Sequence, residues 1–203
     1  MAAQTLSGRV VFVTACSSDL GRAVIFDLAA QGASLILTDP SRDEGNAVCH
    51  EVRQQHGRTN IIFTSLQLGD LEALKRFITN ACGQKGLKKL DAVVYCASSS
   101  SKSCPELHLL SADAFSEIVD RNIVATRNVL SAALHQILLQ KETAITGHDA
   151  APAGGYSIVV IGHVAPSHKE DRSPVYDASA AFVTSLAKSV ARDYGHVRAV
   201  PQV

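Results

Sequence analysis

The sequence is poor in aromatic side chains and carries no net charge. Its 203 residues include no tryptophan, one methionine and an aromatic fraction of 5%. Nineteen basic residues balance nineteen acidic ones when the histidines are neutral. Because no excess of positive charge is present to attract phosphate groups or anionic lipids, we expect neither nucleic acid nor a membrane surface among the partners.

Long apolar runs and paired cysteines are also missing. No stretch approaches the roughly 20 apolar residues that a membrane-spanning helix needs. Residues 1–9 lack the charged and apolar parts of a secretory signal. The five cysteines are odd in number, widely spaced and without a CxxC pair, which excludes a typical disulfide framework or zinc site. These absences predict a soluble, cytoplasmic protein with reduced thiols and no metal.

The residues that are present favour one globular domain over residues 1–203. Hydrophobic residues make up 46% of the chain, which is enough for one sizeable core. Short β-rich runs alternate with longer helical patterns, and this order produces βαβ crossovers and a parallel sheet. The expected strands are 10–14, 34–38, 60–65, 91–96 and 157–161, and the expected helices are 20–31, 42–55, 71–82, 112–139 and 176–194.

The expected strands are almost uniformly apolar, which is typical of a sheet covered by helices on both faces. We therefore predict an α/β fold, a Rossmann-like doubly wound parallel sheet. Residues 141–155 interrupt the pattern with glycine, proline and polar residues, so we expect a flexible insertion there. Residues 196–203 can supply at most a short sixth strand.

Several short motifs follow one another in an informative order. They are the turn 14–21 (TACSSDLG), Asp39 after a second apolar run, the strand end 93–98 (VVYCAS), Asn122 in a long helical pattern and Tyr176. From residue 9 to about residue 200, this order resembles the short-chain dehydrogenase/reductase family. The motifs are degenerate forms of its TGxxxGxG, NNAG and YxxxK signatures.

The resemblance has implications for the fold and for assembly. Members of the family usually continue after the position of Tyr194 through further strands and a helical substrate lid, so we expect the last strand and the lid to be missing. The family commonly dimerises through the helices that match residues 112–139 and 176–194. A homodimer or a higher homo-oligomer is therefore expected.

The resemblance also assigns a nucleotide site, with Thr14, Ser17 and Gly21 in the phosphate-binding turn. Asp39 falls where the family binds the ribose diol of NAD and disfavours NADP. The same residue can equally be a strand-end aspartate without a ligand. If any cofactor binds, the sequence indicates NAD.

Two glycines of the family turn are replaced here, by Ala15 and Asp19. A carboxylate at the start of a helix stabilises that helix, but it repels a phosphate group. At about 4 Å and an effective dielectric constant near 20, two like charges cost about 4 kcal/mol. We therefore expect the cofactor site to be vestigial, with nucleotide binding weak or absent.

The catalytic residues implied by the resemblance are Tyr176, His163 and Asn122. The family's lysine, four residues after the tyrosine, is replaced by Ala180, and the serine thirteen residues before it is replaced by His163. An unperturbed phenol titrates near pH 10 and needs a neighbouring cation to ionise at neutral pH. An imidazole titrates near neutrality, so His163 and Tyr176 form a candidate acid/base pair.

Three functions remain open. The first is a cofactor-independent acid/base catalyst of the isomerase, dehydratase or cyclase type, acting on a small apolar carbonyl compound, for example in specialised metabolism. The second is an NAD(H)-dependent short-chain oxidoreductase with a divergent site. The third is a non-catalytic pseudoenzyme scaffold. The missing lysine leads us to expect the first.

Four further residues have plain structural interpretations. Tyr95 can fill space vacated by a cofactor, but ordinary strand packing is favoured. Cys16 can be a reactive thiol at a helix N-terminus, but a buried, inert thiol is favoured. Lys89 and Arg121 are interpreted as solvated surface charges.

Overall fold

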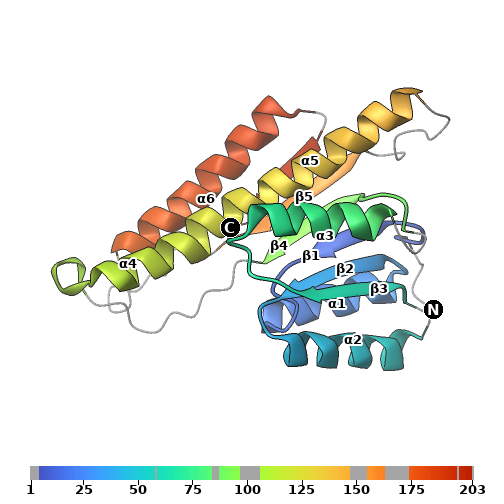
Figure 1. The fold of residues 1–203 in the computed structure, drawn as a ribbon, viewed down its shortest axis with the longest axis horizontal. Helices are drawn as coiled ribbons and strands as arrows, with labels where there is room; N and C mark the ends of the chain where they lie inside the picture. Colours follow the sequence, from blue (N-terminus) through green and yellow to red (C-terminus); the bar gives the residue numbers. More distant parts are fainter. Residues whose placement is uncertain are drawn as a thin grey trace.

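A parallel sheet with the strand order β3-β2-β1-β4-β5-β6 forms the centre of the molecule in the computed structural model (Figure 1). The structure describes residues 5–57, 59–83, 87–96, 106–146, 155–162, 174–195 and 197–202. The strands are β1 (Val10–Val13), β2 (Ser34–Asp39), β3 (Ile61–Ser65), β4 (Ala92–Cys96), β5 (Tyr156–Ile161) and β6 (Val197–Gln202).

The helices alternate with these strands along the chain. They are α1 (Asp19–Ala30), α2 (Arg42–His56), α3 (Leu71–Gly83), the 3-10 turn η1 (Leu107–Leu109), α4 (Ala112–Ile118), the π-helical segment η2 (Val119–Val124), α5 (Ala125–Thr146) and α6 (Pro174–Asp193). The predicted α/β doubly wound fold is confirmed, and the bounds of most elements lie within one or two residues of those expected.

Local sequence explains where several helices begin. A short polar side chain stands just before α1, α2, α3 and α4 and accepts a hydrogen bond from a backbone N–H in the first turn, which would otherwise have no partner. These residues are Ser18, Ser41, Asp70 and Ser111. The capping residues in the sequence therefore determine where these four helices begin.

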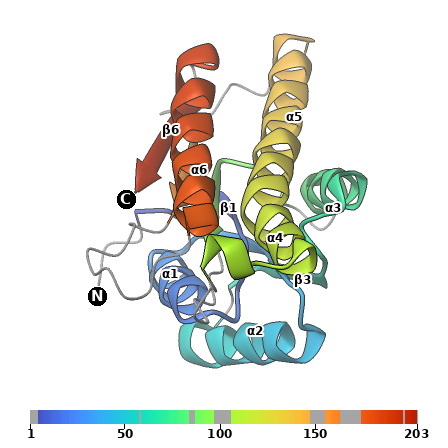
Figure 2. The same cartoon turned by 90° about the vertical axis from the view of Figure 1, so that its left-hand side faces the viewer.

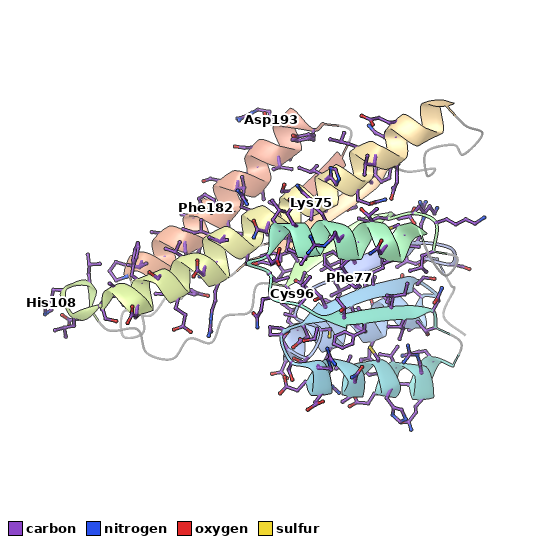
Figure 3. All side chains as sticks on the ribbon, viewed as in Figure 1. Lys75, Phe77, Cys96, His108, Phe182 and Asp193 are labelled. Carbon is purple, nitrogen blue, oxygen red and sulfur yellow. The ribbon has the colours of Figure 1, made fainter. Side chains whose placement is uncertain are left out.

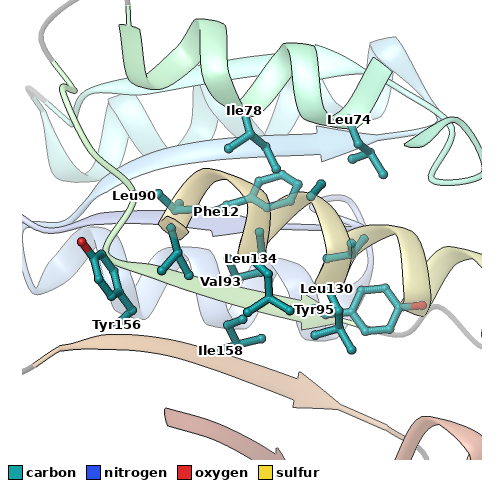
Figure 4. Close-up of a cluster of buried hydrophobic side chains, with 14 of the residues drawn as sticks. Phe12, Leu74, Ile78, Leu90, Val93, Tyr95, Leu130, Leu134, Tyr156 and Ile158 are labelled. Carbon is teal, nitrogen blue, oxygen red and sulfur yellow. The ribbon is translucent and has the colours of Figure 1, made fainter. Parts of the chain in front are cut away.

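Each face of the sheet packs against its own set of helices (Figure 2). Successive side chains of a strand point to opposite faces. Phe12 of β1 lies in a core cluster with residues of α3, α5 and α6, and Figure 4 shows part of this cluster. Its neighbours Val11 and Val13 lie in a second cluster with residues of α1 and α2. This two-sided burial explains why the strands are almost uniformly apolar.

Two expectations about the second half of the chain need correction. The segment from Lys141 was expected to be a loop, but α5 continues to Thr146. Residues 141–146 contain neither glycine nor proline, and these breakers appear only later. The sixth strand is also not short, because β6 pairs with β5 from Tyr156 to Ile161.

Candidate functional site

The candidate nucleotide site lies where the carboxyl ends of β1 and β4 meet. The strand order reverses between these two strands, and in open α/β sheets such a point forms a ligand-binding crevice. Thr14, which is fully buried, connects the two strand ends. Its Oγ1 accepts a hydrogen bond from the backbone N–H of Cys96 at 3.1 Å. Figure 3 labels Cys96 at this position, well apart from His108 at the tip formed by η1.

The turn after β1 keeps the shape of a glycine turn although two glycines are lost. Ala15 has a φ of 50°, a left-handed conformation that costs a non-glycine residue about 1–2 kcal/mol. The retained Gly21 is required by contact, since a Cβ there would lie 2.1 Å from the carbonyl oxygen of Ala15. The backbone of the turn is therefore closely packed against the first turn of α1.

Asp19 is the first residue of α1 rather than its cap. The N-cap is Ser18, whose Oγ accepts a hydrogen bond from the N–H of Gly21 at 3.0 Å. The Asp19 side chain is exposed. Its charge stands at the helix end where a phosphate group would bind, so it opposes an anionic ligand.

The Asp39 carboxylate accepts three hydrogen bonds within this site. Asp39 ends β2 and is 3% exposed. One carboxylate oxygen accepts hydrogen bonds from the N–H of Ser17 at 2.9 Å and from the Ser17 hydroxyl at 2.8 Å. The other oxygen accepts a hydrogen bond from the N–H of Ser41 at 3.0 Å. Asp39 therefore joins the turn after β1 to the start of α2.

The hydroxyl of Ser17 has a second acceptor within reach. Oε2 of Glu44, in the first turn of α2, lies 3.3 Å from Ser17 Oγ. Glu44 was not among the residues expected from the sequence. The spacing of Ser41 and Glu44 fits the S-x-x-E pattern of a helix start, which is a visible signal for this position but not for its contact with Ser17.

Cys16 and Tyr95 have the structural roles that were favoured. Cys16 is fully buried, and burial, with a contribution from the charge of Asp39, raises the pKa of its thiol far above the ordinary range. The thiol is therefore inert. Tyr95 is 1% exposed and packs beside Leu130 of α5 (Figure 4). Burial also raises the pKa of Tyr95.

Asn122 lies in η2 and connects this segment to α6. Its side-chain NH₂ donates to Oγ of Ser179 at 2.8 Å, and that hydroxyl donates to the backbone carbonyl of Tyr176 at 2.7 Å. Thr126 donates its hydroxyl to the carbonyl of Asn122. Asn122 thus holds the first turn of α6 through Ser179, a residue that the sequence interpretation had missed.

Only Tyr176 of the predicted acid/base pair lies among the residues that the structure describes. Tyr176 is half-buried in the first turn of α6, and Ala180 follows one turn later on the same helix. His163 lies outside the described residues, as do Ala97 and Ser98 of the degenerate NNAG motif. The pairing of His163 with Tyr176 therefore stays a prediction.

Two residues interpreted as solvated charges have ion-pair partners. Lys89 Nζ lies 3.1 Å from a carboxylate oxygen of Asp91, which is 4% exposed. Arg9 contacts the same oxygen at 3.0 Å. Arg121 pairs with Glu117 one helical turn away. Lys89 thus helps to neutralise a buried carboxylate at the start of β4. This role corrects the interpretation of Lys89 as a solvated surface charge.

Family membership follows from a comparison over almost the whole chain. The family model described as short chain dehydrogenase matches residues 9–200. This chain belongs to the short-chain dehydrogenase family.

Relatives within the family are named dehydrogenases or reductases. Dehydrogenase/reductase SDR family member 13 of Bos taurus is 32% identical over 97 residues, which are 48% of this chain and 25% of that protein. A (+)-borneol dehydrogenase 2 of Salvia officinalis is 26% identical over 190 residues, which are 94% of this chain and 61% of that protein. The matches thus span a quarter to about three fifths of these relatives.

Solved structures agree on the fold. A short-chain type dehydrogenase/reductase from Mycobacterium ulcerans superimposes with a TM-score of 0.81 at 22% identity, covering 97% of this chain and 67% of that one. Levodione reductase superimposes with a TM-score of 0.80 at 21% identity, covering 97% and 70%. At these identities the likeness establishes the fold alone.

The described residues contain neither a candidate membrane-spanning helix nor a candidate metal-binding cluster. None of the helices in that part of the chain combines the length and the apolar character needed to cross a membrane. In the same residues, no group of three or more histidine, cysteine, aspartate or glutamate side chains is arranged to hold a metal ion.

Proposed function

We propose that this chain is an NAD(H)-preferring oxidoreductase with a divergent catalytic centre. The family and the names of its relatives support this function over the cofactor-independent catalyst that the missing lysine first suggested. The observation that carries the proposal is Asp39, a buried carboxylate at the end of β2 beside the turn after β1. This is the position from which an acidic residue hydrogen-bonds the ribose diol of NAD.

The residues present fit the ribose end of the cofactor. An ionised carboxylate offers about four acceptor sites. Asp39 uses three of them for its bonds to Ser17 and Ser41, and the Cys16 thiol also donates toward it, so a ribose hydroxyl would replace one of these contacts. The close packing of Gly21 against Ala15 keeps the turn in the compact shape that a diphosphate group approaches. Asp19 is the unfavourable element, so we expect modest affinity.

The chemistry would be divided between the cofactor and α6. When bound, the nicotinamide supplies or accepts the hydride. The Tyr176 phenol would exchange the proton with the carbonyl or alcohol oxygen of the substrate. Asn122 and Ser179 hold the backbone of Tyr176. Because Ala180 supplies no ammonium to ionise the phenol, proton transfer would be slow compared with that of relatives that carry the lysine.

Titration of the purified protein with NADH and NADPH, followed by nucleotide fluorescence or calorimetry, tests the proposal. We expect a micromolar Kd for NADH and at least about tenfold weaker binding of NADPH, because a 2′-phosphate would meet the Asp39 carboxylate. An Asp39→Asn variant should lose most of this preference. Absence of binding of either nucleotide at millimolar concentration would refute the proposal.

The cofactor-independent acid/base catalyst is the second candidate, and Ala180 is the observation that favours it. It predicts turnover of a small apolar carbonyl compound by nucleotide-free protein. Tyr176→Phe and His163→Ala should each abolish that turnover, and activity that survives both changes would reject these residues as the catalysts. The remaining alternative, a non-catalytic scaffold, predicts a tight partner and an inert pocket.

We also propose that the chain self-associates through α5 and α6. A groove of about 400 Å³ lies between α3, α5 and α6, and its lining includes Leu134, Leu138 and Leu186. Leu138 is 37% exposed, so a second copy would bury additional apolar surface there. Leu138→Glu should reduce the mass measured by light scattering. Leu107→Glu, at an exposed leucine outside the groove, is the matched control and should leave the mass unchanged.

A further inference from the structure

The Ser17 hydroxyl has one proton and two carboxylate acceptors. Its Oγ lies 2.8 Å from Oδ2 of Asp39 and 3.3 Å from Oε2 of Glu44. The shorter distance favours donation of the proton to Asp39. Rotation of the hydroxyl about one single bond is enough to direct the proton to Glu44 instead. The two acids therefore compete for one donor.

This competition matters because Asp39 is nearly saturated. Ser17 and Ser41 together donate three hydrogen bonds to its carboxylate, and the thiol of Cys16 also donates toward it, so its roughly four acceptor sites are all in use. A ribose diol brings hydroxyl donors that need acceptors. If the Ser17 hydroxyl turns to Glu44, one site on Asp39 becomes available to a ribose hydroxyl.

The backbone around Glu44 is fixed by the same network. The N–H of Glu44 donates to Ser41 Oγ at 3.3 Å, and the N–H of Ser41 donates to Asp39. The next residue, Gly45, is packed so closely that a Cβ would lie 2.2 Å from the Phe63 ring. The start of α2 is thus held against β3, while the Glu44 side chain itself is exposed and able to adjust.

We propose that Glu44 is a second specificity-determining residue of the ribose subsite. It accepts the Ser17 hydroxyl when a ribose diol binds Asp39, and its negative charge adds to the exclusion of a 2′-phosphate. This inference rests on the proposed NAD(H) site. The inference goes beyond that site by assigning the selectivity for NADH over NADPH to two acids, Asp39 and Glu44, that share the Ser17 hydroxyl, instead of to Asp39 alone.

The test is calorimetric titration of NADH and NADPH into Glu44→Gln, Glu44→Ala and Ser17→Ala variants. Glu44→Gln keeps an oxygen acceptor and loses the charge, so the Kd for NADH should stay within about twofold while NADPH binds about fivefold tighter. Glu44→Ala also loses the acceptor, so NADH should bind about fivefold more weakly. In the Ser17→Ala background, Glu44→Ala should no longer weaken NADH binding, because the shared proton is gone.

Asp43→Asn is the matched control, because Asp43 is an exposed acid in the same helical turn and no hydrogen bond to Ser17 is found for it. It should shift the NADPH affinity by less than half of the Glu44→Gln effect. Equal effects of Asp43→Asn and Glu44→Gln on the NADPH affinity would overturn the inference. So would a loss of NADH affinity on Glu44→Ala that is as large in the Ser17→Ala background as in the wild-type protein. Wild-type protein that binds neither nucleotide would instead overturn the NAD(H) proposal itself. Melting temperatures without nucleotide verify that each variant is folded.

Discussion

The carbonyl oxygen of Ala15 occupies the space that a Cβ at Gly21 would need, at a separation of 2.1 Å. Backbone cannot move aside as a flexible side chain can, so the turn and α1 are locked together at this point. The third glycine of the degenerate motif is therefore required for packing, whether or not a ligand binds.

Gly21→Ala should lower the free energy of unfolding by at least about 2 kcal/mol, because overpacking against backbone forces the turn apart. Urea unfolding followed by circular dichroism measures the change. Gly83→Ala is the matched control, since nothing lies within 4 Å of the Cβ position at Gly83. Similar stabilities of the two variants would contradict the packing argument.

Asp19→Asn should tighten NADH binding about tenfold at low ionic strength, because it removes a like charge from the phosphate end of the site. The double variant Ala15→Gly with Asp19→Gly should gain at least as much. The gain should shrink in 0.5 M salt, which screens exposed charges. Asp113→Asn, in the first turn of α4, should have no effect. A salt-independent gain would mean that the charge is not the cause.

Asp91→Asn should lower the free energy of unfolding by about 2 kcal/mol, since the buried carboxylate loses its charge-assisted bonds to Arg9 and Lys89. Both cations are partly exposed, which keeps the loss below that of a fully buried pair. Glu72→Gln removes the exposed pair with Lys75 and should cost less than about 0.5 kcal/mol. Chemical denaturation of both variants provides the comparison.

Alkaline pH should destabilise the protein through its buried thiols. Burial raises the pKa of Cys96 to about 11 and, with the charge of Asp91, that of Cys82 to about 12. In the unfolded chain a thiol titrates near pH 8.5, so the unfolded state releases these protons first. The contribution of these thiols to stability is complete below about pH 8.5 and is lost as the pH rises toward 11 and 12. Urea midpoints between pH 7.5 and 10.5 should fall, and they should fall less steeply in a Cys82→Ala, Cys96→Ala double variant.

Ala180→Lys should lower the pH at which one tyrosine ionises, because an ammonium would stand one helical turn from Tyr176. Ultraviolet difference titration detects the ionisation, and the added change should vanish when Tyr176→Phe is combined with it. Ala181→Lys places the same charge on an exposed neighbouring position and serves as the control. An equal shift in the control variant would show that the effect is not local to Tyr176.

The sequence predicted the sheet well because burial on both faces leaves a direct trace in apolar runs such as Leu35–Leu37. The start of α1 was placed within one residue, but the cap is Ser18 and not Asp19. Both residue types suit that position, so local pattern alone did not separate them.

Contacts between distant residues could not be predicted. The bond of Ser17 to Asp39, the ion pair of Lys89 with Asp91 and the bond of Asn122 to Ser179 depend on how strands and helices are placed relative to one another. The candidate nucleotide residues were located through the order of the motifs. Their hydrogen-bond partners, above all Glu44, depend on how the turn after β1 and the start of α2 are placed in three dimensions.

The π-helical segment Val119–Val124 has a geometric consequence for the elements before it. A π turn accommodates one extra residue in an otherwise regular helix. Because the wider turn takes up that residue, the α-helical parts on its two sides keep nearly the same rotation about the axis. Deleting one residue from this segment is therefore expected to restore a regular helix and to leave α4 and the exposed leucines of η1 in place, so that the insertion changes the backbone around Asn122 without reorienting the arm that precedes it.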